Sequence, residues 1–170
     1  MVKILKFISS ALFTITIVLA VLLVGVKLLG LQVYTVLSGS MEPEIHTGSL
    51  IYVREIEPTK LEKGDIITYR ISGNMTATHR IVEVISDESN PDNVQFRTKG
   101  DANDMVDPSP IDGDAVIGTT IFSVPYLGYL AVYMQHPPGI YLVIAISAAI
   151  ILFVIAVDML TDGKNKSLNK

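Results

Sequence analysis

Residues 140–157 have the sequence IYLVIAISAAIILFVIAV, eighteen residues without a charge and with Ser147 as the only polar side chain. A second uncharged stretch, residues 7–26, has the sequence FISSALFTITIVLAVLLVGV. As helices, both stretches are long enough to cross the hydrocarbon core of a bilayer. The few hydroxyl side chains are tolerated there, because they can hydrogen-bond to the helix's own carbonyls. The two stretches therefore predict a chain anchored at both ends.

Two other interpretations of these stretches are weaker. A cleaved secretory signal has a shorter apolar core than residues 7–26 and ends at an Ala-x-Ala type of site, which does not occur before Gly39. A buried helix of a soluble protein usually has one polar face, whereas residues 140–157 are apolar all round. We therefore expect a retained N-terminal anchor and a C-terminal span.

The distribution of charge predicts the orientation. The chain of 170 residues has 13 basic and 17 acidic side chains, a net charge of −4. Residues 32–139 hold seven basic and fifteen acidic residues, a net charge of −8. Lysines flank the outer ends of the two apolar stretches, at Lys3, Lys6, Lys164, Lys166 and Lys170. Basic flanks stay in the cytoplasm. We therefore expect both termini on the cytoplasmic side of a cell membrane and the acidic middle on its outer side.

These considerations divide the chain into five parts. We predict a cytoplasmic tail (residues 1–6), a transmembrane helix (7–31), an extracytoplasmic domain (32–139), a second transmembrane helix (140–159) and a cytoplasmic tail (160–170).

The middle part has the pattern of a β-domain. Short runs rich in β-branched and aromatic residues are bounded by turn residues, as is typical of strands. The predicted strands are residues 50–53, 65–70, 78–85, 94–98 and 115–124. We expect an antiparallel β-barrel or sandwich, mostly β, between the two helices. Residues 126–134 are apolar and aromatic, and they fit an interfacial belt, a last strand or a packed helix.

Composition excludes several kinds of site. The chain has no cysteine, which excludes disulfides, cysteine-ligated metals and a thiol nucleophile such as that of a sortase-like transpeptidase. Three histidines are too few to favour an all-histidine metal site, and we expect no metal and no cofactor. The acidic balance argues against nucleic acid as a partner.

Three segments carry residues suited to catalysis. The first is residues 38–43, SGSMEP, in which Ser40 follows the first span by too few residues to leave the membrane surface. The second is His79, which, unlike His46 and His136, adjoins a well-formed predicted strand. The third is residues 98–108, TKGDANDMVDP, with three carboxylates after a strand.

Each segment also has an ordinary interpretation. Ser-Gly-Ser is a common loop sequence, and a histidine at the head of a strand is more often structural. The acidic segment could be a solvated loop or a calcium loop, although the calcium-loop spacing is only half present. Together the segments contain the parts of an acyl-transfer site: a hydroxyl, a base to take its proton, and a carboxylate to orient the base. From the residues alone, Asp101, Asp104 and Asp107 all remain candidates for that carboxylate.

Several ordered motifs resemble those of type I signal peptidases (peptidase family S26), in the form found in the endoplasmic reticulum, archaea and some Gram-positive bacteria. Residues 38–43 resemble the nucleophile motif, and residues 64–67 resemble the first long strand. Residues 78–81, THRI, resemble the motif with the general base, a lysine in ordinary bacterial enzymes and a histidine here. Residues 99–103 and Asp107 resemble the acidic motif, although Ala102 and Asp104 depart from its usual pattern.

The resemblance implies a role for each matching residue. Ser40 resembles the nucleophile, His79 the general base and Asp107 the acid that orients it, while Asp101 resembles an auxiliary acid of the site. Ser38 resembles a hydroxyl that joins the Ser40 backbone N–H in an oxyanion hole. Lys99, which lies within the acidic segment, is interpreted as a structural or substrate-facing residue rather than the base.

The implied activity is that of a membrane-anchored serine endopeptidase that removes signal peptides from exported preproteins and cuts after small residues. Its expected partners are these preproteins and the bilayer, and an association with the export translocon is left open. Two alternatives also stay open. One is a doubly anchored β-domain that binds an exported partner without catalysis, and the other is a peptidase dedicated to a few substrates.

Overall fold

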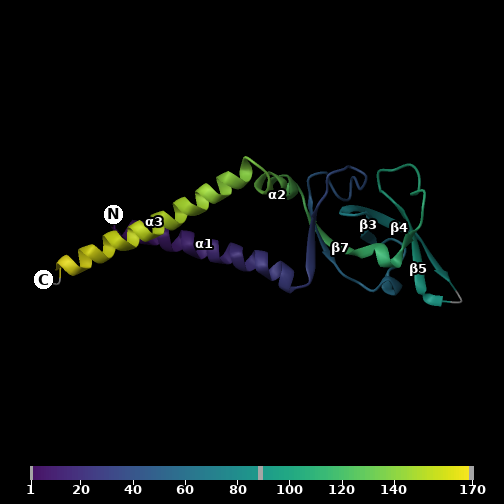
Figure 1. The fold of residues 1–170 in the computed structure, drawn as a ribbon, viewed down its shortest axis with the longest axis horizontal. Helices are drawn as coiled ribbons and strands as arrows, with labels where there is room; N and C mark the ends of the chain where they lie inside the picture. The colour runs from purple at the N-terminus through teal and green to yellow at the C-terminus, as the bar shows by residue number, and fades with distance from the viewer. Residues whose placement is uncertain (1, 88–89, 169–170) are drawn as a thin grey trace. The chain divides into compact units, whose positions relative to one another are not determined.

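The computed structural model describes residues 2–87 and 90–168. The chain divides into two compact units, one of residues 27–132 and one made of residues 1–26 and 133–170. The first contains all seven strands, and the second contains most of the two long helices. Figure 1 colours the chain from its N-terminus to its C-terminus and labels the main elements.

The two long helices have the apolar composition predicted for them. Helix α1 is Val2–Leu28 and helix α3 is Gly139–Leu168. Within the described residues, one helical segment is long and apolar enough to cross a membrane, Gly139–Val157, with a mean hydropathy of 3.1. A shorter apolar segment, Lys6–Val18, lies in α1. Helix α3 continues beyond the apolar segment Gly139–Val157 and includes Lys166.

Within the described residues, seven strands form a single antiparallel sheet, which confirms the predicted antiparallel β-domain between two apolar helices. The strands are β1 (Leu31–Thr35), β2 (Leu50–Arg54), β3 (Ile66–Ser72), β4 (Met75–Asp87), β5 (Asn90–Lys99), β6 (Ile111–Asp112) and β7 (Val116–Val124). Their order in the sheet is β1-β2-β7-β3-β4-β5-β6. Short 3₁₀ turns, Pro58–Lys60 and Gly113–Ala115, precede β3 and β7.

Strand β7 joins the two halves of the sheet. Its first half pairs with β3, with Tyr69 opposite Val116, and its second half pairs with β2, with Leu50 opposite Val124. The strands β3, β4 and β5 form consecutive antiparallel pairs and lie side by side in Figure 1. One strand thus connects the segment after the first helix to the hairpins that carry the other predicted site residues.

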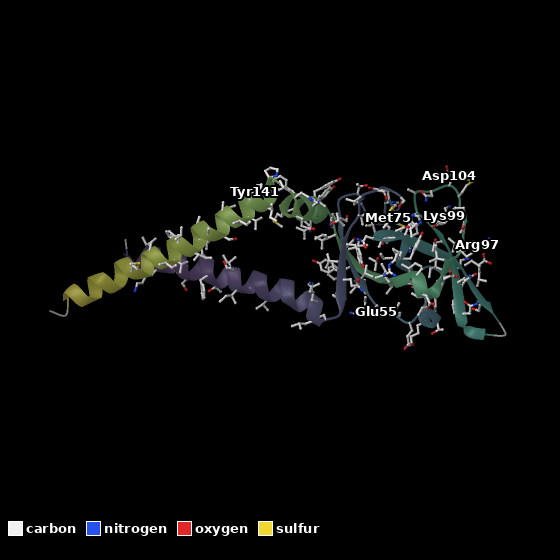
Figure 2. All side chains as sticks on the ribbon, in the orientation of Figure 1. Glu55, Met75, Arg97, Lys99, Asp104 and Tyr141 are labelled. Atoms are coloured by element: carbon white, nitrogen blue, oxygen red, sulfur yellow. The ribbon has the colours of Figure 1, made fainter. Side chains whose placement is uncertain are left out.

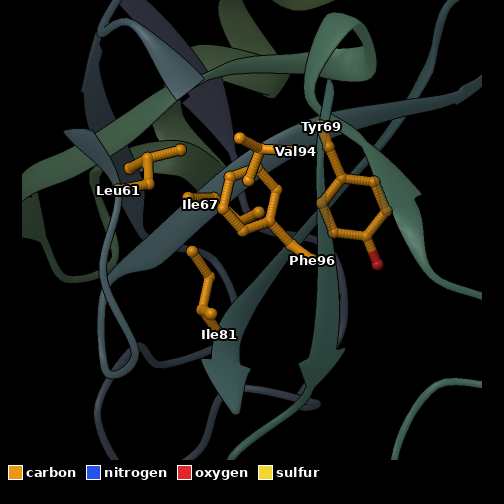
Figure 3. Packing of buried hydrophobic residues seen from close by; sticks show 6 residues of the cluster. All are labelled: Leu61, Ile67, Tyr69, Ile81, Val94 and Phe96. Atoms are coloured by element: carbon orange, nitrogen blue, oxygen red, sulfur yellow. The ribbon is translucent and has the colours of Figure 1, made fainter. Parts of the chain in front are cut away.

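Two apolar clusters hold this unit together. The larger one consists of Leu61, which follows the first 3₁₀ turn, and of residues on β3, β4 and β5: Ile67, Tyr69, Ile81, Val94 and Phe96. Figure 3 shows the Tyr69 hydroxyl pointing away from the other members of this cluster. The second cluster consists of Met41, Ile45, Ile51 and Val53. Because Met41 and Ile45 come from a loop rather than a strand, this second cluster fixes the loop that contains Ser40.

Residues 126–134, for which strand and helix were both open, form a helix. Helix α2 is Leu127–Gln135, and Tyr126 before it has a positive φ of 62°. A strand would alternate buried and exposed residues, whereas in α2 the buried residue is Gly128.

Candidate active site

Ser40 lies in a loop between β1 and β2, residues 36–49, which we call the Ser40 loop. Met41, directly after Ser40, is only 1% exposed and packs in the second cluster. On the other side of Ser40, the backbone N–H of Ala102 donates to the Ser40 carbonyl at 2.9 Å. A Cβ at Gly100 would lie 2.5 Å from that carbonyl oxygen, so this approach requires glycine. Ser40 is therefore held by buried packing and by the loop that follows β5.

A second set of contacts closes the Ser40 loop on itself. Glu42 accepts a hydrogen bond from the Thr47 N–H at 3.1 Å, and its other carboxylate oxygen lies 2.6 Å from His46 Nδ1. These hydrogen bonds lower the pKa of Glu42, and the one with His46 has the larger effect. The carboxylate thus stays ionised at lower pH, and its contribution to the stability of the loop is lost only as pH falls through the lowered pKa.

His79 lies on β4 within reach of Ser40. Its Nε2 is 3.2 Å from the Ser40 hydroxyl oxygen, and its Nδ1 is 2.6 Å from Asp107 Oδ2. The side chains of His79 and Asp107 are 14% and 17% exposed, so solvent screens their interaction little. With Nδ1–H donating to the carboxylate, Nε2 is free to accept the serine proton. Ser40, His79 and Asp107 thus form one continuous chain of hydrogen bonds.

The sheet register explains why these groups meet. Across β3 and β4, His79 is opposite Ile67, and across β4 and β5, Ile81 is opposite Thr98. Side chains two residues apart on a strand share a face, so His79, Tyr69 and Thr98 lie on one face of three adjacent strands. The backbone N–H of Asp107 donates to the Thr98 carbonyl at 2.8 Å, which returns the loop after β5 to this face.

Tyr69 and Thr98 were not predicted as site residues, yet both contact the Asp107 carboxylate. The Thr98 hydroxyl donates to Asp107 Oδ2 at 2.6 Å, and the Tyr69 hydroxyl donates to the same oxygen at 3.3 Å. Burial, with a smaller effect of Asp107, raises the pKa of Tyr69, so its hydroxyl stays a donor in mildly alkaline solution. The sequence holds a signal for both, because alternate residues of a strand share a face. Tyr69 lies two residues after Ile67, and Thr98 lies two residues after Phe96, so both fall on the buried face.

The other predicted acids lie elsewhere in the loop between β5 and β6. Asp101 forms a bidentate ion pair with Arg80, at 2.6 and 2.9 Å, and Arg80 also donates to the Gly64 carbonyl. Asp104 is exposed on the outer part of the loop (Figure 2). The geometry therefore brings Asp107 to His79 and brings Asp101 to Arg80, so the two acids have different partners.

Ser38, the predicted oxyanion-hole hydroxyl, lies beside Ser40, and the two hydroxyl oxygens are 3.4 Å apart. A cavity of about 520 Å³ opens next to Ser40 and His79. It is lined by residues 34–38 and by the β3–β4 hairpin around Met75, among others. A separate cavity of about 590 Å³, near Pro58 and Gly113, is lined by none of the residues of the Ser40–His79–Asp107 chain.

Among the described residues, no cluster of His, Cys, Asp or Glu has the arrangement of a metal site. The hydrogen-bonded chain Ser40–His79–Asp107 has the geometry that serine hydrolases use. Comparison with known proteins places the chain more narrowly. Residues 7–95 match the family described as "Signal peptidase, peptidase S26", and the chain belongs to this family.

Curated relatives agree with this family. The chain is 41% identical over 112 residues to "Signal peptidase I W" of Bacillus subtilis (strain 168), covering 61% of this chain and 57% of the relative. It is 28% identical over 129 residues to "Signal peptidase complex catalytic subunit SEC11C" of Homo sapiens, covering 71% and 66%. It is 30% identical over 114 residues to "Signal peptidase complex catalytic subunit SEC11" of Plasmodium falciparum (isolate 3D7), covering 62% and 60%. The aligned part thus spans less than two thirds of each relative.

The family match includes Ser40 and His79 and ends before the loop between β5 and β6. The place of Asp107 in the site therefore rests on its own contacts with His79, Thr98 and Tyr69 rather than on that match.

Proposed function

We propose that this protein is a membrane-anchored serine endopeptidase that removes N-terminal signal peptides from exported preproteins, cutting after small residues. The observation that carries the proposal is the hydrogen-bonded chain from Ser40 Oγ through His79 to Asp107, with distances of 3.2 and 2.6 Å. A serine hydroxyl is a weak nucleophile until a base takes its proton, and this chain supplies the base and its orienting acid.

In the proposed reaction, Ser40 Oγ attacks the scissile carbonyl while His79 Nε2 takes the serine proton. The negative charge on the carbonyl oxygen is stabilised by the Ser40 backbone N–H and the Ser38 hydroxyl. His79 then gives the proton to the leaving amine, which departs with the mature protein. Water, deprotonated by His79, attacks the acyl-enzyme and releases the signal peptide from Ser40. Asp107 keeps Nδ1–H directed toward itself and stabilises the imidazolium in both halves.

The substrate site in this proposal is the cavity beside Ser40 and His79. Its lining combines the last residues of β1, which is an end strand of the sheet, with the β3–β4 hairpin. An extended peptide can pair with an end strand through backbone hydrogen bonds. Shallow pockets in such a groove admit small side chains, which is the requirement of an Ala-x-Ala site.

Anchoring completes the proposal. We take α1 and α3 as transmembrane helices, with both termini cytoplasmic and the strand-containing unit on the outer side. We expect the sheet of this unit to form a β-barrel or sandwich. The apolar segment Gly139–Val157 supports the second span. Ser40 is then tethered near the surface at which an exported preprotein emerges, and this proximity raises the effective concentration of the cleavage site.

The direct test is to incubate the purified, detergent-solubilised chain with a labelled preprotein and to map the new N-terminus by mass spectrometry. We expect one cut after a small residue at the signal junction. A panel of unrelated preproteins distinguishes general from dedicated processing. Absence of any cleavage, together with stable binding of the intact substrate, would instead favour the non-catalytic β-domain.

We expect Thr98→Val to lower kcat by about tenfold, because it removes a hydrogen bond to a charged carboxylate while conserving shape. The matched control is Thr68→Val, since Thr68 is equally buried on β3 but its hydroxyl contacts Thr78 at 2.8 Å rather than Asp107. Steady-state rates of both variants against wild type provide the measurement. Equal losses in the two variants would mean that Thr98 acts only through general packing.

A further inference from the structure

The first turn of α2 lies on the base of the Ser40 loop. This loop leaves β1 and returns to β2, and two backbone hydrogen bonds close it where it returns. The Gly48 N–H donates to the Val36 carbonyl at 2.8 Å, and the Val36 N–H donates to the Ser49 carbonyl at 2.9 Å. Gly48 therefore marks the point at which the loop is fixed to the sheet.

Helix α2 adds a third hydrogen bond at that point. The Gly128 N–H, in the first turn of the helix, donates to the Gly48 carbonyl at 2.9 Å. N–H groups in a first turn have no partner within their helix, so this one is available for a contact outside it. A Cβ at Gly128 would lie 2.7 Å from the carbonyl oxygens of both Gly48 and Ser49. The buried Gly128 thus permits a backbone approach that no other residue would allow.

The Tyr129 ring occupies the space next to Gly48. A Cβ built on Gly48 would lie 2.0–2.4 Å from three atoms of that ring. Gly48 also has a φ of +80°, a conformation that favours glycine. The ring and the Gly128 N–H therefore clamp Gly48 from α2, within the unit of residues 27–132.

We propose that the first turn of α2 is a positioning element for Ser40, which acts through Gly48 and makes the helix before α3 part of the scaffold of the active site. Ser40 lies eight residues before Gly48 in the same loop. Loosening the loop at its base would let Ser40 Oγ move relative to His79 Nε2. A misplacement of about 1 Å costs roughly 10²-fold in rate, so the clamp matters even without touching substrate. This inference rests on the proposed function of Ser40.

The test uses the full chain in detergent and the variant Tyr129→Ala. Tyr129 is 56% exposed, so its truncation should leave the fold intact, as thermal unfolding can verify. We expect covalent labelling of Ser40 by a fluorophosphonate probe to slow by about 10- to 100-fold, with an equal fall in kcat and little change in KM. Tyr129→Phe should restore the wild-type rate, because the ring and not the hydroxyl covers Gly48.

Tyr133→Ala is the matched control, since it removes the same side chain one turn later from an exposed position. We expect it to label at the wild-type rate. Gly128→Ala is the second variant, and its Cβ should displace Gly48 and slow labelling as well. Wild-type labelling in Tyr129→Ala, or an equal loss in Tyr133→Ala, would overturn the inference.

The proposed function fails in a different way. If wild type labels at Ser40 but cleaves no preprotein, the substrate class is wrong and the labelling comparison still tests the clamp. If wild type neither labels at Ser40 nor cleaves a preprotein, the nucleophile is wrong and the inference falls with it.

Discussion

Ser40→Ala is expected to lower kcat for preprotein cleavage by about 10⁵- to 10⁶-fold. Without the hydroxyl no acyl-enzyme forms, and His79 has no serine proton to accept. The remaining rate would come from water attack helped by binding and by the oxyanion donors. Cleavage of a labelled preprotein over hours, with quantification of the processed product, measures this loss.

Two further variants sharpen the test of Ser40. Ser38→Ala should retain labelling of Ser40 by a fluorophosphonate but lower kcat by about 10²- to 10³-fold, as expected for the loss of one oxyanion donor. His79→Lys should not retain the full activity of the wild type. A lysine side chain has a single nitrogen and lacks the second one that contacts Asp107. An active Ser40→Ala enzyme would remove Ser40 as the nucleophile, whatever the other variants do.

The strands were predictable where local pattern and burial agree. Alternation and turn residues indicated β2, β3, β4, β5 and β7, and the structure has a strand at each. Strand β1 was missed: Leu31 was assigned to the first span, and residues 32–35 were assigned to no element. Strand β6 has two residues, too few for any periodicity. Both β1 and β6 exist through pairing with distant segments, which local sequence does not encode.

The site was predictable in its parts but not in its geometry. Ser40 and His79 stand out by residue type and by the motifs around them, whereas the choice among three carboxylates depends on how the loop between β5 and β6 folds. The residues alone left these carboxylates open and the family resemblance favoured Asp107; in the structure, Asp107 faces His79 and Asp101 pairs with Arg80. The inward register marks Thr98 as a buried polar residue, but its contact with Asp107 requires the loop to fold back onto β5.

The role of Glu42 illustrates the same limit. Its position in the nucleophile motif is evident from the sequence, but its contacts with His46 and Thr47 form only once the loop turns back on itself. Local motifs therefore indicate which residues matter, and long-range folding decides which of them meet.

The choice of the orienting acid leads to the second large effect. Asp107→Asn should lower kcat by about 10³- to 10⁴-fold, because a neutral amide no longer stabilises the imidazolium that forms at His79. Fold stability should change less than activity, since Thr98 and Tyr69 can still hydrogen-bond to the amide oxygen. Steady-state kinetics and thermal unfolding of the same preparation separate the two effects.

Asp101→Asn and Asp104→Asn are the matched controls, with the same change of chemistry in the same loop. Asp101→Asn breaks the ion pair with Arg80, which is partly buried, so we expect a lower thermal midpoint and a loss of kcat of about tenfold or less. Asp104→Asn should behave as wild type, because its side chain is exposed. The opposite result would be a loss of kcat of about 10³- to 10⁴-fold in Asp101→Asn together with an active Asp107→Asn. In that case the orienting acid is Asp101, and the contact between His79 and Asp107 is only structural. The predicted order of kcat is lowest for Asp107→Asn, intermediate for Asp101→Asn and highest for Asp104→Asn. It follows from which of the three carboxylates reaches His79 Nδ1.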